Sequence, residues 1–253
     1  MKNRFALRLL LIVICALPLG AEDQLTTVQI VERMALRAEE MDLAAKEWGY
    51  WQESVQKKLD SKNRIKEEEK KLRKTIWLEG KPYMELVKIN DKDPDAGKQK
   101  EEAERKAKFL KSLHENNKKE ESVTWNDLYS KYDFQLLPAD PIGRYVFSFK
   151  PKPGKLRERS RSEKVLNHVQ GTLWADEEFN IVRAEAKLQD NVRFALGILG
   201  NLEKLELKFE QQDFQNISVP STFYVHFKAR LALLKTEERQ IQATYKDFFR
   251  RQK

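Results

Sequence analysis

The stretch YDFQLLPADPIGRYVFSFKP (132–151), followed after a basic connector by VLNHVQGTLWADEEFNIVRAEAKL (165–188), decides the fold. In its first part, aromatic residues alternate with smaller or polar ones from Tyr145 to Phe149. In its second part, two further alternating segments flank the acidic turn Asp176-Glu177-Glu178. Apolar residues at every second position are typical of antiparallel strands with one dry face and one wet face. The stretch therefore predicts three consecutive antiparallel strands.

The same alternation continues to the end of the chain. The second of the three strands is expected to begin at Val165, and later strands are expected at 203–211, 223–233 and 237–250. The segment 191–200 is apolar, contains two glycines, and fits either a helix or a buried strand. Sequential strands joined by short turns curl into a barrel or half-barrel.

The segments before this sheet predict one helix and three strands. Apolar residues recur at three- and four-residue steps from Leu25 to Glu47, without Gly or Pro, which predicts an amphipathic helix capped by Thr26 or Thr27. Segment 47–61 shifts toward alternation and predicts a strand. Residues 67–90 predict two short strands joined at the bend Gly80-Lys81-Pro82.

Segment 91–122 is predicted to be a charged helical insertion. It opens with acidic residues and a proline, as helix starts do, and carries only a thin apolar stripe. From 90 to 121, Lys and Arg are as numerous as Asp and Glu, so the basic excess of a nucleic-acid surface is missing. A solvated helix with paired charges is favoured, and a lid over a ligand is the alternative. The next segment, 125–137, predicts a short helix that Pro138 stops.

Residues 1–21 are typical of a signal peptide. A basic start precedes an apolar run of eleven residues, 9–19, and small residues follow it. A membrane-spanning helix needs about 20 apolar residues, so a cleaved secretory signal is favoured over an uncleaved anchor. The single cysteine, Cys15, lies in this run, so the mature chain is expected to have neither a disulfide nor a thiol nucleophile. We therefore expect an exported, periplasmic protein.

The sequence offers no recognisable constellation for catalysis or metal binding. His114, His168 and His226 are far apart, and a structural or surface role is favoured for each. Neither a zinc motif nor a phosphate-binding glycine loop occurs. The turn Asp176-Glu177-Glu178 supplies too few oxygens for calcium, which takes about six to eight ligands. The sequence therefore predicts a protein that is not an enzyme and uses no metal or cofactor.

The charge distribution limits the partners. The formal net charge is +8, or +5 without the three basic residues of the predicted signal. Residues 152–164 are the most basic run after the signal. A solvated loop is favoured there, and the alternative is transient contact with anionic lipid headgroups or an envelope protein. No aromatic residue is interleaved for base stacking, so no nucleic-acid partner is expected.

Six short motifs stand out between Tyr132 and Arg250. They are Tyr132-Asp133, Gly143-Arg144, the alternating strand 145–149, Pro151-Lys152, Leu173-Trp174-Ala175-Asp176 and the strand that starts at Ile181. In this order they resemble the periplasmic lipoprotein-carrier family, the LolA/LolB-like or outer-membrane lipoprotein-sorting superfamily. The resemblance implies an unclosed β-barrel with helices on its concave side and an apolar cavity that holds acyl chains. It also implies a carrier that uses no cofactor and makes no bonds.

Together these observations predict an α+β fold: a single domain, 22–253, built as an antiparallel half-open β-barrel whose concave face is covered by helices. The first functional hypothesis is a carrier or chaperone that holds lipoprotein acyl chains or another apolar lipid in the half-barrel. The second is a non-catalytic docking module for envelope proteins, with the cavity filled by side chains. The candidate cavity residues, for which ordinary core packing is the alternative, are Phe147, Leu173, Val182, Phe223, Val225 and Phe227.

Overall fold

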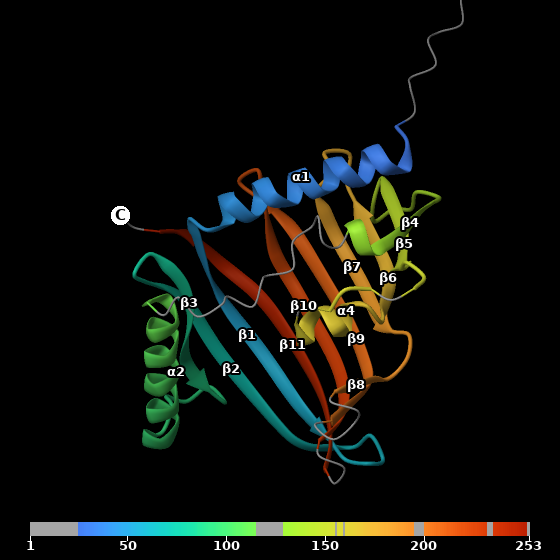
Figure 1. The fold of residues 1–253 in the computed structure, drawn as a ribbon. Coiled ribbons are helices and arrows are strands. Elements are labelled where there is room, and N and C mark those ends of the chain that lie inside the picture. Colours follow the sequence, from blue (N-terminus) through green and yellow to red (C-terminus); the bar gives the residue numbers. More distant parts are fainter. Residues whose placement is uncertain are drawn as a thin grey trace, which may run out of the picture.

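An open antiparallel sheet with helices packed on it forms the protein (Figure 1). The computed structural model describes residues 25–114, 129–154, 156–158, 160–194, 200–231 and 235–251. The predicted signal peptide lies outside these residues. The sheet does not close, because β3 and β4 stand at its two edges and are not paired with each other. The predicted α+β class and the half-open barrel are therefore confirmed.

Eleven strands within the described residues make up the sheet. Their order is β3-β2-β1-β11-β10-β9-β7-β6-β5-β4, with β8 beside β9. The strands are β1 (Trp48–Leu59), β2 (Ile65–Leu78), β3 (Lys81–Ile89), β4 (Tyr132–Leu137), β5 (Tyr145–Pro151), β6 (Val169–Ala175), β7 (Ile181–Leu188), β8 (Val192–Phe194), β9 (Gly200–Phe214), β10 (Ile217–Leu231) and β11 (Lys235–Arg250).

The first and last strands in the chain, β1 and β11, are neighbours in the sheet. β1 pairs with β11 along its whole length, from Trp48 opposite Arg250 to Leu59 opposite Glu238. Gly49 sits inside this pair, where a Cβ atom would lie 2.7 Å from the rings of Phe249 and Trp77. The N-terminal strands are therefore joined to the rest of the sheet through the last strand of the chain.

Helix α1 (Thr27–Ala45) confirms the predicted amphipathic helix and its cap. The Thr26 hydroxyl accepts a hydrogen bond from the Gln29 backbone N–H, and the Gln29 side chain reaches back to Thr26, which together form a capping box. Figure 1 shows α1 running across the ends of the strands. Its buried side chains are Ile30, Val31 and Met34. Val28 and Leu36, which belong to the predicted apolar stripe, are 51% and 63% exposed.

The predicted hairpin is present, with longer strands than expected. Its turn is Glu79-Gly80, where both residues have positive φ values, 48° and 78°. Such a two-residue turn matches the twist of the flanking strands. Pro82, expected in the bend, lies within β3 opposite Trp77. A proline is tolerated there because β3 is an edge strand.

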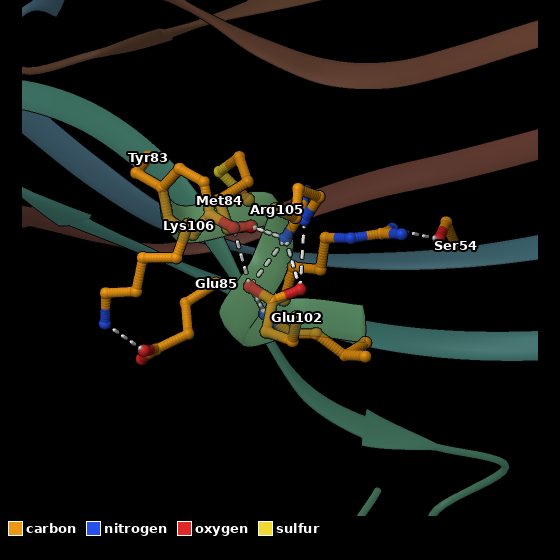
Figure 2. Close-up of polar contacts among 9 residues, drawn as sticks. Ser54, Tyr83, Met84, Glu85, Glu102, Arg105 and Lys106 are labelled. Carbon is orange, nitrogen blue, oxygen red and sulfur yellow. Dashed lines mark hydrogen bonds and ion pairs between the residues drawn. The ribbon is translucent and has the colours of Figure 1, made fainter. Parts of the chain in front are cut away.

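Helix α2 (Ala96–His114) lies along β3 rather than over the concave face (Figures 1 and 2). The Glu102 carboxylate accepts hydrogen bonds from the Tyr83 hydroxyl at 2.9 Å and from the Leu86 N–H at 3.3 Å. Arg105 donates to the Met84 carbonyl at 2.5 Å. Burial, followed by the bond to Glu102, raises the pKa of Tyr83 to about 12. The described part of the charged insertion is therefore a cap on the sheet edge.

Two local predictions are wrong. Residues 132–137, expected at the end of a helix, form β4 and pair with β5, so Phe134 lies opposite Phe149. Val165, expected at the start of a strand, lies in α4 (Arg161–Leu166), and the strand begins at Val169. In the first case, helical residues within the described part of the predicted helix end at Lys131, and the chain is extended from Tyr132. In the second case, a short helix occupies the residues that were expected to begin the strand.

Candidate ligand cavity

Two apolar rows cross the face of the sheet that α1 covers. Each row consists of residues directly opposite one another on neighbouring strands, so their side chains lie on the same face. The upper row is Phe147, Leu173, Ala184, Phe209, Phe223 and Ala243. The lower row is Phe149, Gly171, Ala186, Leu207, Val225 and Ile241. Together the two rows form one continuous apolar surface from β5 to β11, called the apolar wall below.

Helix α1 closes one end of this wall. Ile30, Val31 and Met34 form one buried cluster with Phe147, Leu173, Ala175 and Ile181. Phe147 is completely buried and Leu173 is 6% exposed. Burying an aliphatic or aromatic side chain of this size contributes about 1.5–3 kcal/mol. The contact therefore holds α1 firmly on the β5–β7 end of the sheet.

Between α1 and the sheet lies an apolar cavity of about 130 Å³. Burial raises the pKa of its one acidic group, Asp42; the neighbouring Glu39 adds to this and Lys46 opposes it. The volume is below the roughly 300–1,000 Å³ of ordinary small-molecule sites. The cavity residues are Ala38, Met41, Asp42, Leu173, Asn180, Ile181, Ala184, Phe209, Gln211 and Ser218.

A second, polar cavity of about 370 Å³ adjoins the first. The two share Asn180, Gln211 and Ser218 in their walls. Arg37 of α1 reaches into this region and donates from Nε to Asn180 Oδ1 at 2.8 Å. The polar cavity is lined by Arg37, Asp176, Glu178, Asn180, Val182, Gln211, Gln212, Asp213, Asn216 and Ser218.

The six predicted cavity residues fall into three groups. Phe147 and Leu173 lie opposite each other in the buried cluster, and only Leu173 also lines the apolar cavity. Val182 lines the polar cavity. Its neighbour Ile181 occupies the buried position, because a register shift between Trp174 and Ala175 brings Ile181 opposite Ala175. A bulge of this kind moves a side chain to the other face, and simple alternation does not reveal it.

The other three predicted residues lie together on β10. Phe223, Val225 and Phe227 are half-buried. Their partners on β9 are Phe209, Leu207 and Leu205. Phe223 and Val225 therefore continue the two apolar rows beyond the cavity beneath α1. Partly exposed apolar side chains in a contiguous row are a surface that an apolar ligand can cover.

Sequence reasoning missed the polar anchor of α4. Lys131 and Glu163 form an ion pair at 3.1 Å with side chains 9% and 1% exposed. The Tyr132 hydroxyl donates a hydrogen bond to the Leu166 carbonyl, and burial strongly raises the pKa of that hydroxyl. Since Tyr132 packs on Phe134 and Phe149, these contacts hold α4 on the same face as α1.

Some basic side chains of the run 152–164 already have partners within the protein. Lys152 donates to the Ser130 carbonyl at 3.0 Å, and Lys164 pairs with Glu158 at 3.6 Å. Lys155 and Arg159 lie outside the described residues.

The motif residues Gly143 and Trp174 have a structural role. The Trp174 ring N–H donates to Asp140 at 2.8 Å, and Asp140 also accepts from the Ile142 and Gly143 N–H groups. The Trp174 bond is the main reason that the pKa of Asp140 is lowered. A Cβ on Gly143 would lie 3.0 Å from the Ala175 carbonyl. These residues attach the loop that precedes β5 onto strand β6, and they do not line the cavity.

One histidine is more buried than its polar neighbours suggest. His226 is 7% exposed and lies between Glu238, at 2.8 Å, and Glu206, at 3.5 Å. It points to the face opposite the apolar rows, since it alternates with Val225 and Phe227. No group of three or more His, Cys, Asp or Glu side chains within the described residues is placed to hold a metal ion.

The outer face also carries a hollow of about 310 Å³. Most of its walls are polar residues of β6, β7 and β9, among them Glu185 and Lys208, which pair at 3.3 Å. Gly171, Ala186 and Leu207 of the lower row also line it. Separately, none of the helices within the described residues is long and apolar enough to cross a membrane.

Two of the solved structures that are similar to this chain share little sequence with it. A DUF1329 family protein from Desulfovibrio piger is 13% identical, with 87% of this chain and 92% of that one covered and a TM-score of 0.37. A "putative outer membrane lipoprotein-sorting protein domain" from Vibrio parahaemolyticus is 11% identical, with 87% and 93% covered and a TM-score of 0.37. No family model and no curated protein matches the chain.

Proposed function

We propose that the protein is a periplasmic carrier or chaperone for lipoprotein acyl chains or another apolar lipid. The main observation in support is the apolar wall from β5 to β11. Helix α1 covers only one end of this wall, and Phe223, Val225 and Phe227 are left half-buried. Each methylene removed from water contributes about 0.8 kcal/mol, so a chain lying along this wall binds reversibly without any bond being made.

The small volume beneath α1 fits this proposal when the ligand is long. A cavity of about 130 Å³ accepts only the end of an acyl chain. The remainder would lie on the lower row and on β10, where side chains are already partly exposed. Phe147 and Leu173 then support the wall, and the β10 residues contact the chain.

Uptake of a fluorescent fatty acid or lipopeptide by the delipidated protein tests the proposal. We expect saturable binding that is lost in Phe227→Glu, because a carboxylate on the apolar wall is costly to desolvate. The matched control is Gln242→Glu, which adds the same charge at an exposed position next to Ile241 on the opposite face. Circular dichroism checks that both variants remain folded.

The second candidate function is a non-catalytic module that docks an envelope protein. The observation in its favour is that Phe147, Leu173, Ala175 and Ile181 already fill much of the space beneath α1. Absence of any saturable uptake by the folded wild-type protein would favour this module over the carrier. A partner bound through the basic run 152–164 would then be lost in Arg157→Glu, while uptake by a carrier would be unaffected.

A further inference from the structure

We propose that the joined cavities beneath α1 select an amphiphile whose polar end carries a positive charge. The apolar cavity takes the start of the chain, and the polar cavity takes the head. This inference rests on the proposed function for the apolar part and adds the chemistry of the head.

The two cavities meet at a shared wall. Asn180, Gln211 and Ser218 line both, so the apolar space beside Met41 and Leu173 lies directly against the polar one. The polar cavity has about 370 Å³ against about 130 Å³ for the apolar one. A molecule that fills both therefore has a bulky polar end and an apolar end that enters between α1 and the sheet.

The charges around the polar cavity favour a cation. Three carboxylates, Asp176, Glu178 and Asp213, line it against one guanidinium, Arg37. Asp42 adds a fourth acid in the wall of the adjoining apolar cavity. A head with only anionic groups would meet net repulsion here, whereas an ammonium group meets net attraction.

The single cation is already committed within the fold. Arg37 donates to Asn180 at 2.8 Å and pairs with Glu40 at 3.2 Å. Asp176 accepts from the backbone and side chain of Asn180 at 2.8 and 2.9 Å. The side-chain carboxylates of Glu178 and Asp213 make no ion pair or hydrogen bond with any residue in the parts of the chain that the structure describes. These two carboxylates are therefore the groups that can receive an ammonium head.

Three twelve-carbon amphiphiles that differ only in their heads test the inference: an alkyl ammonium, an alkyl carboxylate and an uncharged alkyl glycoside. Each competes, below its micelle concentration, with the uncharged dye N-phenyl-1-naphthylamine bound to the purified protein. We expect the ammonium compound to bind about tenfold more tightly than the carboxylate at low salt, and this preference to shrink at high salt because the carboxylates are exposed.

The double variant Glu178→Gln/Asp213→Asn should bring the ammonium and carboxylate compounds to within about twofold of each other, without weakening the glycoside. Glu177→Gln is the matched control, since Glu177 lies beside Glu178 and does not line the cavity. Equal binding of all three heads by the wild-type protein would overturn the inference and leave the carrier intact. Failure of every amphiphile to displace the dye would overturn both.

Discussion

Gly171 shows how little room individual residues have on the apolar wall. A Cβ atom there would lie 1.9 Å from the Glu185 carbonyl oxygen and 2.8 Å from the ring of Phe149. Phe149 stands opposite Gly171 and covers the missing side chain. At this point in the lower row, the backbone of β6 therefore packs directly against the backbone of β7 and the Phe149 ring.

We expect Gly171→Ala to destabilise the protein by roughly 1–3 kcal/mol, because the backbone of β7 must move to relieve the overlap. Urea unfolding followed by circular dichroism measures the change. Gly97→Ala is the control, since its Cβ would meet only the Asp95 side chain, at 3.3 Å, on an exposed helix end. Equal stabilities of the two variants would contradict the close packing described for Gly171.

The Lys131–Glu163 pair gives a second prediction at this scale. Removing one partner of a buried ion pair leaves an uncompensated charge and costs roughly 3–5 kcal/mol. We therefore expect Glu163→Ala to be strongly destabilising. The double variant Lys131→Met/Glu163→Met should recover most of the loss, as measured by thermal unfolding. A double variant as unstable as the single one would show that Glu163 acts through contacts other than Lys131.

The candidate site could be predicted from the sequence only where alternation is regular. Phe147 and Leu173 follow from the period-two pattern, and the structure buries both. Ile181 does not follow, because a register shift carries it to the apolar face in place of Val182. The Lys131–Glu163 ion pair could not be predicted either. The two residues are far apart in the sequence, and they meet only because α4 packs beside the start of β4.

At the scale of elements, α2 protects an edge that would otherwise be open. The Leu86 N–H and the Met84 carbonyl belong to the edge strand, and side chains of α2 bind both. Glu102 accepts a hydrogen bond from the Leu86 N–H, and Arg105 donates one to the Met84 carbonyl (Figure 2). These side chains supply the acceptor and the donor that a further strand would supply. Unprotected edges invite pairing with another chain.

We expect Glu102→Ala/Arg105→Ala to self-associate through β3 as concentration rises. Light scattering across a concentration series measures this. Lys98→Ala/Glu101→Ala is the matched control. It removes an ion pair of the same spacing from the same helix, at 2.7 Å, and neither side chain has a hydrogen bond or ion pair with the described residues of β3. A double variant that stays as dispersed as the control would contradict the capping role of α2.

The same contacts predict a dependence on pH. Burial alone would raise the pKa of Glu102, but hydrogen bonds from Arg105, Tyr83 and the Leu86 N–H lower it overall. A carboxyl with a lowered folded pKa adds stability above its ordinary value of 4.5, and this is lost as pH falls through the folded pKa. We expect Glu102→Gln to lose less stability than the wild type between about pH 5 and pH 3. Equal acid sensitivity in denaturant titrations would contradict this.

Elements with long periodic patterns could be predicted, and those fixed by distant contacts could not. α1 and strands β9 to β11 follow from helical and alternating patterns in their own residues. β4 was missed because Leu128 and Tyr132 have helical spacing, whereas pairing with β5 and the contact of Tyr132 with Phe149 favour an extended chain. The position of α2 beside β3 also depends on side chains that pair across the fold.

For the whole molecule, α1 separates the β5–β7 end of the apolar wall from water. We expect Met34→Asp to loosen α1, since Met34 is 2% exposed within the buried cluster. The apolar dye ANS should then bind with increased fluorescence while the sheet signal in circular dichroism is retained. Leu36→Asp is the control, because Leu36 lies on the same helix and is 63% exposed. Equal ANS binding by both variants would show that α1 does not shield the wall.

The pairing of β1 with β11 sets an order for folding. During synthesis the first hairpin emerges early, but one flank of β1 stays without a neighbour until residues 235–250 have been made. Contacts between such distant parts of a chain form slowly, on a scale of about milliseconds to seconds. A chain halted before β11 therefore contains two separate pieces of sheet, and the facing edges of β1 and β10 have unpaired backbone groups. A protease or chaperone can bind these edges before the native protein has formed.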